Sequence, residues 1–188
     1  MKFFWTLLTG TILFSSCKTG SSTTPSTGSG YRDLKGYFQE ELNGLEKTKP
    51  GLFKTVSLNT KHDSVTINAP DSLQLHNMLA PFMDVDLHKP SLQGAYDTIL
   101  LADQFSGKRS LMYKAKEAST LPQEIILELD NAQHITAVQL NQHVRNLVYE
   151  YEQNLEYQQN HHIRITTRQH IAFLPEKELD IKITMMHL

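Results

Sequence analysis

The sequence predicts an α+β domain in which two helices pack on a strongly bent antiparallel sheet of about seven to nine strands, a layout similar to half of a barrel. Three observations support this prediction. Apolar residues recur at helical spacing in the first half of the chain, they alternate with polar residues from Thr98 onward, and turn-forming residues separate the alternating segments.

Two segments in the first half of the chain are predicted to be helical. The first, 31–47, ends before Pro50-Gly51, and the second begins after Asp71, which is suited to an N-cap position. Each segment places its apolar residues on one face of an amphipathic helix. These residues are Leu34, Phe38, Leu42 and Leu45 in the first helix, and Leu75, Leu79 and Phe82 in the second.

Alternating segments predict the strands in order. Between the helices, "FKTVSLN" and "DSVTIN" form a short hairpin with its turn at Lys61-His62, in which Val56 and Leu58 face Val65 and Ile67. Next, "TILLADQ" and "SLMYKAKE" flank a turn at Ser106-Gly107. "EIILEL" and "HITAVQL" then flank Asp130-Asn131. Three further strands complete the sheet.

The register of the next hairpin follows from its own residues. If Gln159, Asn160 and His161 form the loop, the numbers of paired residues sum to 320. Apolar residues then share one face of the hairpin and oppositely charged residues face each other on the other, and a slip of one residue would mix the two faces. The predicted pairs include Tyr157 with Ile163, Tyr149 with Ile171, Leu147 with Phe173, Glu152 with Arg168 and Glu150 with His170.

The last hairpin is expected to continue the same apolar face. With Pro175-Glu176-Lys177 as its loop, Ile165 would lie opposite His187. The apolar residues of its second strand are Leu179, Ile181, Ile183 and Met185.

A polar stripe interrupts this apolar face, because the register brings Gln153 beside Thr167 and Tyr151 beside Gln169. Buried polar groups cost stability unless they are paired. One interpretation is that this end of the sheet is hydrated or that the polar groups bond to one another. The other is a ligand groove that combines apolar walls with a few orienting polar groups. The candidate groove residues are Tyr149, Tyr151, Gln153, Tyr157, Thr167 and Gln169.

Charged residues give no catalytic or metal site that we favour. Glu150, Glu152 and Glu156 form an acidic row, which is more typical of a solvated sheet face with cross-strand ion pairs than of an acid/base pair. Asp84, Asp86 and His88 alternate before Pro90 and could share a cation, but a solvated loop is the favoured interpretation. We therefore predict no catalytic residue, no metal and no cofactor. The net charge of −2 also argues against nucleic acid as a partner.

The start of the chain is typical of an export signal. Met1-Lys2 is followed by twelve apolar residues, Phe3 to Phe14, a run that is too short to span a bilayer. Ser15-Ser16-Cys17 then places the only cysteine of the chain after two small residues. In this respect the sequence resembles bacterial lipoprotein precursors, although Phe14 stands where that family usually has an aliphatic residue. The resemblance implies cleavage before Cys17 and lipidation of that residue.

These features divide the chain into three parts. Residues 1–16 are the expected signal peptide, 17–30 the lipidated cysteine with a flexible Ser/Thr/Gly tether, and 31–188 a single periplasmic domain. Thirteen flexible residues reach ~20 Å on average, so the domain stays near the bilayer. Lys18 follows the cysteine where lipoproteins retained at the inner membrane carry Asp. By resemblance to lipoproteins that lack this Asp, the sequence implies an outer-membrane lipoprotein. We expect its anchor to lie in the periplasmic leaflet.

The segment Leu79 to Tyr96, with "APFMDVDLHKP" and "GAY", resembles small uncharacterised lipoproteins of Bacteroidota. This resemblance supports the compartment and brings no known activity. Two functions remain open. The first is a non-enzymatic envelope protein that binds a partner protein or supports assembly, for which we expect an exposed apolar edge or patch. The second is a carrier or binder of an apolar small molecule or lipid, similar to lipoprotein-carrier half-barrels, for which we expect a concave sheet lined by the tyrosines.

Overall fold

The computed structural model describes residues 30–102 and 109–186. The predicted signal peptide, Cys17, the tether up to Ser29, the turn at Ser106-Gly107 and His187 lie outside the described residues. The described elements are α1 (Leu34–Thr48), β1 (Gly51–Leu58), β2 (Lys61–Ile67), α2 (Ser72–Met83), η1 (Pro90–Leu92), β3 (Tyr96–Ala102), β4 (Arg109–Ala115), β5 (Glu124–Leu129), β6 (Ile135–Arg145), β7 (Tyr149–Gln158), β8 (His162–Ile171) and β9 (Lys177–Met186).

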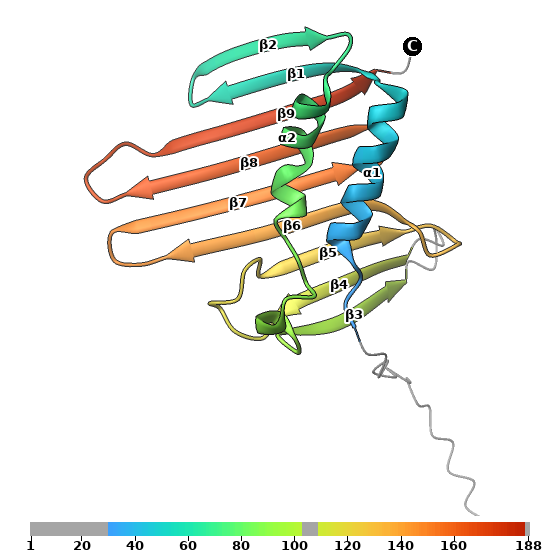
Figure 1. Cartoon of the computed structure of the whole chain (residues 1–188). Helices are drawn as coiled ribbons and strands as arrows, with labels where there is room; N and C mark the ends of the chain where they lie inside the picture. Colours follow the sequence, from blue (N-terminus) through green and yellow to red (C-terminus); the bar gives the residue numbers. More distant parts are fainter. Residues whose placement is uncertain (1–29, 103–108, 187–188) are drawn as a thin grey trace, which may run out of the picture.

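Nine antiparallel strands form one open sheet in the order β2-β1-β9-β8-β7-β6-β5-β4-β3. Both helices lie across the same side of this sheet, as Figure 1 shows, and we call that side the helix-facing side. The predicted α+β class, two helices on a bent antiparallel sheet, is therefore confirmed. Strand β1 reaches the sheet by pairing with β9, so the first and last strands of the described chain are neighbours.

Helix α1 forms as the sequence predicts. Asp33 caps its first turn by accepting a hydrogen bond of 2.9 Å from the backbone N–H of Gly36. The helix ends where Lys49 adopts a left-handed backbone conformation with φ of 43°, just before Pro50. The four predicted face residues are buried against the sheet: Leu34, Phe38, Leu42 and Leu45.

A capping box starts helix α2. The Asp71 carboxylate accepts a hydrogen bond of 2.7 Å from the N–H of Gln74, and the Gln74 side chain accepts one of 3.0 Å from the N–H of Asp71. The predicted N-cap is therefore confirmed. The helix buries the predicted Leu75, Leu79 and Phe82, together with Met78.

The densest part of the core lies where the two helices meet the sheet. Phe38 of α1, Phe82 of α2 and Tyr157 of β7 are each no more than 1% exposed. Their rings pack with centroid separations of 4.9 Å between the two phenylalanines and 5.2 and 6.0 Å from each to the tyrosine. These three rings fix both helices to one end of β7.

The register predicted for β7 and β8 is confirmed, with Tyr157 opposite Ile163, Glu152 opposite Arg168 and Tyr149 opposite Ile171. The ladder ends at Tyr149, so the predicted pairing of Leu147 with Phe173 is wrong. The reason is the Asn146 side chain, whose oxygen accepts hydrogen bonds from the N–H groups of Val148 and Tyr149 and so closes the β6–β7 turn.

The predicted register of the last hairpin is wrong. Ile165 lies opposite Ile181, six residues before His187 in the chain, and the β8–β9 turn spans 172–176 in place of the expected Pro175-Glu176-Lys177 loop. The chain reverses early because Phe173 adopts φ of 67° and Leu174 N–H bonds back to the Ile171 carbonyl. The error is an even number of residues, so the apolar side was still predicted correctly.

The predicted turn of the first hairpin is also shifted. The turn consists of Asn59 and Thr60, and Val56 lies opposite Asp63, whereas the sequence suggested a turn at Lys61-His62. Asn59 adopts φ of 52°, a left-handed conformation that asparagine tolerates better than lysine or histidine.

Candidate functional site

Five of the six predicted groove residues lie together at one end of the helix-facing side. Tyr149, Tyr151 and Gln153 alternate along β7, and Thr167 and Gln169 lie opposite the last two of them on β8. All five are half-buried. The rings of Tyr149 and Tyr151 stack with centroids 6.3 Å apart. The predicted polar stripe is therefore one continuous surface at this end of the sheet.

Tyr157, the sixth predicted residue, lies in the core at the other end of β7. Its hydroxyl donates a hydrogen bond to Glu41 of α1, which also accepts one of 2.8 Å from Gln159. Burial and the adjacent Glu41 carboxylate hold the pKa of Tyr157 well above its usual value. The structure thus assigns Tyr157 to the contact between α1 and the sheet.

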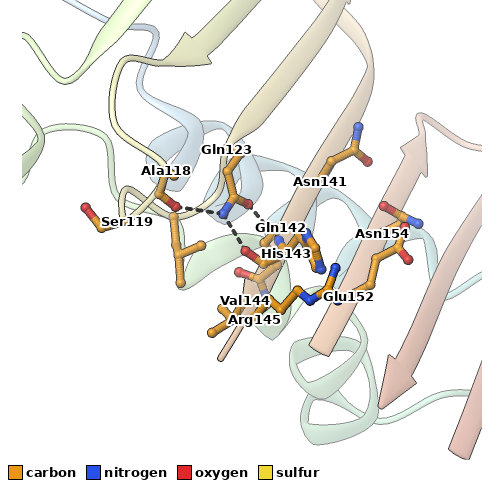
Figure 2. A pocket seen from close by; sticks show the side chains of 11 residues that line it. Ala118, Ser119, Gln123, Asn141, Gln142, His143, Val144, Arg145, Glu152 and Asn154 are labelled. Carbon is orange, nitrogen blue, oxygen red and sulfur yellow. Dashed lines mark hydrogen bonds between the residues drawn. The ribbon is translucent and has the colours of Figure 1, made fainter. Parts of the chain in front are cut away.

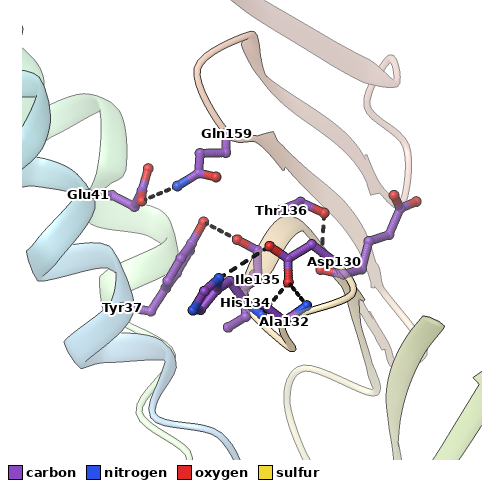
Figure 3. Close-up of polar contacts among 9 residues, drawn as sticks. Tyr37, Glu41, Asp130, Ala132, His134, Ile135, Thr136 and Gln159 are labelled. Carbon is purple, nitrogen blue, oxygen red and sulfur yellow. Dashed lines mark hydrogen bonds and ion pairs between the residues drawn. The ribbon is translucent and has the colours of Figure 1, made fainter. Parts of the chain in front are cut away.

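A second tyrosine of α1 reinforces this contact. Tyr37 donates a hydrogen bond of 3.3 Å to the Ile135 carbonyl at the start of β6, and Figure 3 shows it beside the β5–β6 turn. Asp130 closes that turn by accepting bonds of 2.8 Å from the N–H groups of Ala132 and His134. Burial, with Glu41 nearby, raises the pKa of Tyr37. These bonds between tyrosines, carbonyls and a carboxylate indicate a structural role.

Gln153 joins the polar stripe to a cavity. The side-chain amide of Gln142 on β6 donates a hydrogen bond of 2.6 Å to the side-chain oxygen (Oε1) of Gln153. The Gln153 side chain is therefore paired with a residue of β6 and not with Thr167 of β8. The cavity beside this pair has a volume of about 410 Å³, and we call it the α2 cavity because it lies at the end of that helix. Its apolar walls are Val85, Leu92, Leu121, Pro122, Leu140 and Leu155.

Charged residues mark the rim of the α2 cavity. Asp84, Asp86 and Lys89 lie at this rim. They belong to the loop in which Asp84, Asp86 and His88 alternate and could share a cation. Asp86 instead accepts the N–H of His88 at 3.0 Å and lies 3.8 Å from the Lys35 ammonium, while the His88 ring bonds to the Tyr31 carbonyl. Among the described residues, no group of three His, Cys, Asp or Glu side chains could hold a metal ion.

A larger depression of about 800 Å³ lies beside the start of β5, where β6 continues beyond its pairing with that strand (Figure 2). The side chain of Gln123, the residue before β5, takes the place of a β5 residue opposite His143 of β6. This side chain donates to the His143 carbonyl at 2.6 Å and accepts from the His143 N–H at 2.7 Å. Because this amide imitates the next step of a β ladder, it caps the exposed edge of β6.

Ion pairs cover the side of β7 and β8 that faces away from the helices. Arg168 lies 3.8 Å from Glu152 and 3.1 Å from Glu176, and Glu150 lies 3.0 Å from the His143 ring. Arg164 donates two hydrogen bonds of 2.9 and 3.0 Å to Asp180 and does not bond to Glu156. The acidic row therefore belongs to a solvated face with cross-strand ion pairs, as expected. Glu150 lies opposite His170 and Glu156 opposite Arg164, as the predicted register requires, although Glu150 and Arg164 form their ion pairs with other residues.

Two apolar surfaces were missed by the sequence analysis. The first, which we call the apolar tip, consists of Leu147, Val148, Phe173 and Leu174 at the β6–β7 and β8–β9 turns, with exposed fractions of 101%, 60%, 104% and 56%. Both turns contain two consecutive large apolar residues, which breaks the alternation of the flanking strands. This break in the alternation is the feature of the sequence from which the apolar tip could have been predicted.

The second surface is the outermost strand β3, and we call it the β3 edge. It exposes three consecutive apolar side chains, Ile99, Leu100 and Leu101, at 39%, 63% and 45%. Strand β2, at the opposite edge of the sheet, begins with the charged and polar sequence Lys61-His62-Asp63. Charged residues protect an edge strand from pairing with other chains, and the β3 edge lacks that protection along these three residues.

Comparisons with known proteins found no matching family model, curated protein or solved structure. Among the described residues, neither α1 nor α2 is long and apolar enough to cross a membrane.

Proposed function

We propose that this chain is a lipid-anchored lipoprotein in the periplasmic leaflet of the outer membrane and that its domain binds a partner protein of the envelope without catalysing a reaction. The observation that supports this function best is the β3 edge. A strand with three exposed apolar side chains at the boundary of an open sheet is a template on which another chain can add a strand.

The chemistry of the β3 edge indicates the kind of partner. Ile99 and Leu101 project on one side of the sheet and Leu100 on the other, because successive residues of a strand alternate. An extended segment with apolar residues at alternate positions would match both sides and bond to the outer backbone groups of β3. We therefore expect the partner to contribute an apolar β-strand.

Site-specific cross-linking tests this proposal in intact cells. A photoreactive phenylalanine analogue at Leu100 should give a defined adduct with one envelope protein, and Ile99→Lys in the same chain should remove the adduct. The matched control is the analogue at Val65, which is 50% exposed on the opposite edge strand. Equal labelling from both positions, or none from Leu100, would contradict a partner site at the β3 edge.

The anchor is tested separately. Cys17→Ser should move the protein from the membrane pellet to a soluble or unprocessed form, and labelled fatty acid should no longer be incorporated. Membrane association and labelling that stay unchanged would show that the chain is not a lipoprotein of this type.

The α2 cavity supports a second candidate, a binder of an apolar small molecule or lipid. Its volume of about 410 Å³ falls in the range of ligand sites, and its lining combines apolar walls with the Gln142–Gln153 pair and a charged rim. Val85→Trp should fill the cavity and abolish any ligand found by mass spectrometry of the purified native protein. If neither the native chain nor Val85→Trp contains a bound small molecule, partner binding is the only proposed function that stands.

A further inference from the structure

We infer that the apolar tip inserts into the headgroup and upper acyl region of a phospholipid bilayer, so that the domain touches the membrane directly. This inference rests on the proposed function in one respect: the anchor at Cys17 would keep a bilayer within reach. The remaining argument depends on described residues and on the length of the predicted tether.

The apolar tip differs from the scattered apolar residues of an ordinary protein surface. Single exposed leucines are common and need no explanation. Here two turns that are adjacent in the sheet each present two large apolar side chains, and Leu147 and Phe173 are fully exposed. The Ala172 N–H donates a hydrogen bond of 2.9 Å to the Val148 carbonyl, which holds the turns together as one surface.

Part of the backbone of the apolar tip already has hydrogen-bond partners within the protein. A polar backbone group that enters the membrane needs an internal partner, since lipid chains provide none. The Asn146 side chain satisfies the N–H groups of Val148 and Tyr149, and the Asn146 N–H bonds to the Tyr149 carbonyl at 2.8 Å. In the other turn, the Leu174 N–H bonds to the Ile171 carbonyl at 2.9 Å.

The place where the tether joins the domain favours a bilayer as the occupant. Tyr31 bonds through its hydroxyl to the N–H and carbonyl of Tyr96, at the start of β3. In the antiparallel order, the start of β3 lies at the same end of the sheet as the β6–β7 and β8–β9 turns. Strands β3 and β7 are four strand spacings apart, about 19 Å. A flexible chain of thirteen residues, the length of the predicted tether from Lys18 to Gly30, would span ~20 Å on average.

The residues behind the apolar tip also fit a membrane interface. Tyr149 and Tyr151 follow it on the helix-facing side, and tyrosines are favoured where an apolar ring meets a hydrated boundary. Both arginines near the apolar tip are paired with carboxylates, Arg145 with Glu150 at 3.9 Å and Arg168 with Glu176 at 3.1 Å. Insertion should therefore depend on apolar contact and not on anionic lipid or salt.

Tryptophan fluorescence in vesicles tests the inference with the full chain. Trp5, the only tryptophan, lies in the predicted signal peptide, so Phe173→Trp places a reporter at the apolar tip. The purified protein is reconstituted into zwitterionic phosphatidylcholine vesicles with bromine on the acyl chains, and the unmodified chain gives the background. We expect about a twofold loss of emission for Phe173→Trp, and the same for Leu147→Trp, at both low and high salt.

Asn131→Trp is the matched control, because this exposed turn residue lies between β5 and β6 at the opposite end of the sheet. Its emission should not change. A Phe173→Trp chain that is anchored to the vesicles but whose emission is not quenched overturns the inference and leaves the anchor intact. Quenching of Phe173→Trp that occurs only when Cys17 is also replaced by Ser overturns it too, since the anchored form would then not insert.

Two further outcomes are decisive. Quenching of Phe173→Trp that persists with Cys17→Ser supports the apolar tip and shows that it inserts without help from the anchor. If the Phe173→Trp reporter is unquenched by bromolipid but becomes shielded from aqueous acrylamide when envelope proteins are added, the apolar tip binds a protein and the bilayer inference is wrong.

Discussion

The two ends of strand β7 have the same alternation of side chains but different surroundings. At one end, Leu155 and Tyr157 are 4% and 1% exposed because both helices pack over them. At the other end, Tyr149, Tyr151 and Gln153 face the same side of the sheet and are only half-buried. Alternation thus identifies the side that is apolar, whereas the length of strand that is covered depends on where the helices lie.

The boundary between these two ends is polar. Gln153 stands next to Leu155 on the helix-facing side and bonds to Gln142 of the neighbouring strand. Beyond it the sheet continues to the apolar tip. The covered end therefore holds the fold together, and the open end carries the apolar tip, to which we assign contact with the membrane.

The largest expected effect is on the covered end. Phe38→Ala should lower the free energy of unfolding by about 3–5 kcal/mol, because it opens a cavity beside Phe82 and Tyr157. Urea denaturation measures the change. Tyr149→Ala at the open end is the control and should cost about 1 kcal/mol or less. Equal losses for the two variants would show that the two ends of β7 do not differ as the structure indicates.

A smaller effect is expected at alkaline pH. Burial raises the pKa of Tyr96 from 10.0 to about 12. Between these values the unfolded chain has lost a proton that the folded chain retains, so the free energy of unfolding is full below pH 10 and falls as the pH rises toward 12. The loss should be on the order of 1–2 kcal/mol.

Tyr96→Phe is the control for this pH dependence. It removes the hydrogen bond of 2.9 Å to the Pro122 carbonyl and lowers stability at neutral pH, but it should make the decline between pH 10 and 12 shallower by the share of Tyr96, while the other buried tyrosines, Tyr37, Tyr113 and Tyr157, keep theirs. A variant whose alkaline decline equals that of the original chain would assign the effect to other groups.

The polar boundary should respond less strongly. Gln153→Leu leaves the Gln142 amide without its partner and should cost about 1 kcal/mol. The double variant Gln142→Leu with Gln153→Leu should recover most of that loss, since both polar groups are replaced together. Thermal unfolding of the four proteins in this cycle measures the coupling, and additive effects would mean that the two amides do not interact.

The smallest effect on stability is expected at the apolar tip. Leu147→Asp with Phe173→Asp should change the free energy of unfolding by no more than about 0.5 kcal/mol, because both side chains are fully exposed. The same double variant should lose contact with vesicles. A large fall in stability would indicate that the two turns support the fold and are not a free surface.

The sequence predicted much of this fold because its signals are local. Helical spacing located α1 and α2, and the match of apolar and charged residues across the β7–β8 hairpin fixed its register. The β8–β9 register was predicted wrongly because a left-handed residue at Phe173 and one turn hydrogen bond decided where the chain reverses. The alternation of apolar and polar residues predicts neither the left-handed conformation nor this hydrogen bond.

The candidate site divides in the same way. Five of the six predicted groove residues share one surface because strand alternation requires it, and this much the sequence determined by itself. Only the tertiary structure decided that Tyr157 lies beneath α1, that Gln153 bonds to Gln142, and that Leu147 and Phe173 extend into solvent. The physical reason is that burial depends on which distant segment packs over a residue, and α1, more than one hundred residues before β7 in the chain, is not encoded in the local pattern of that strand.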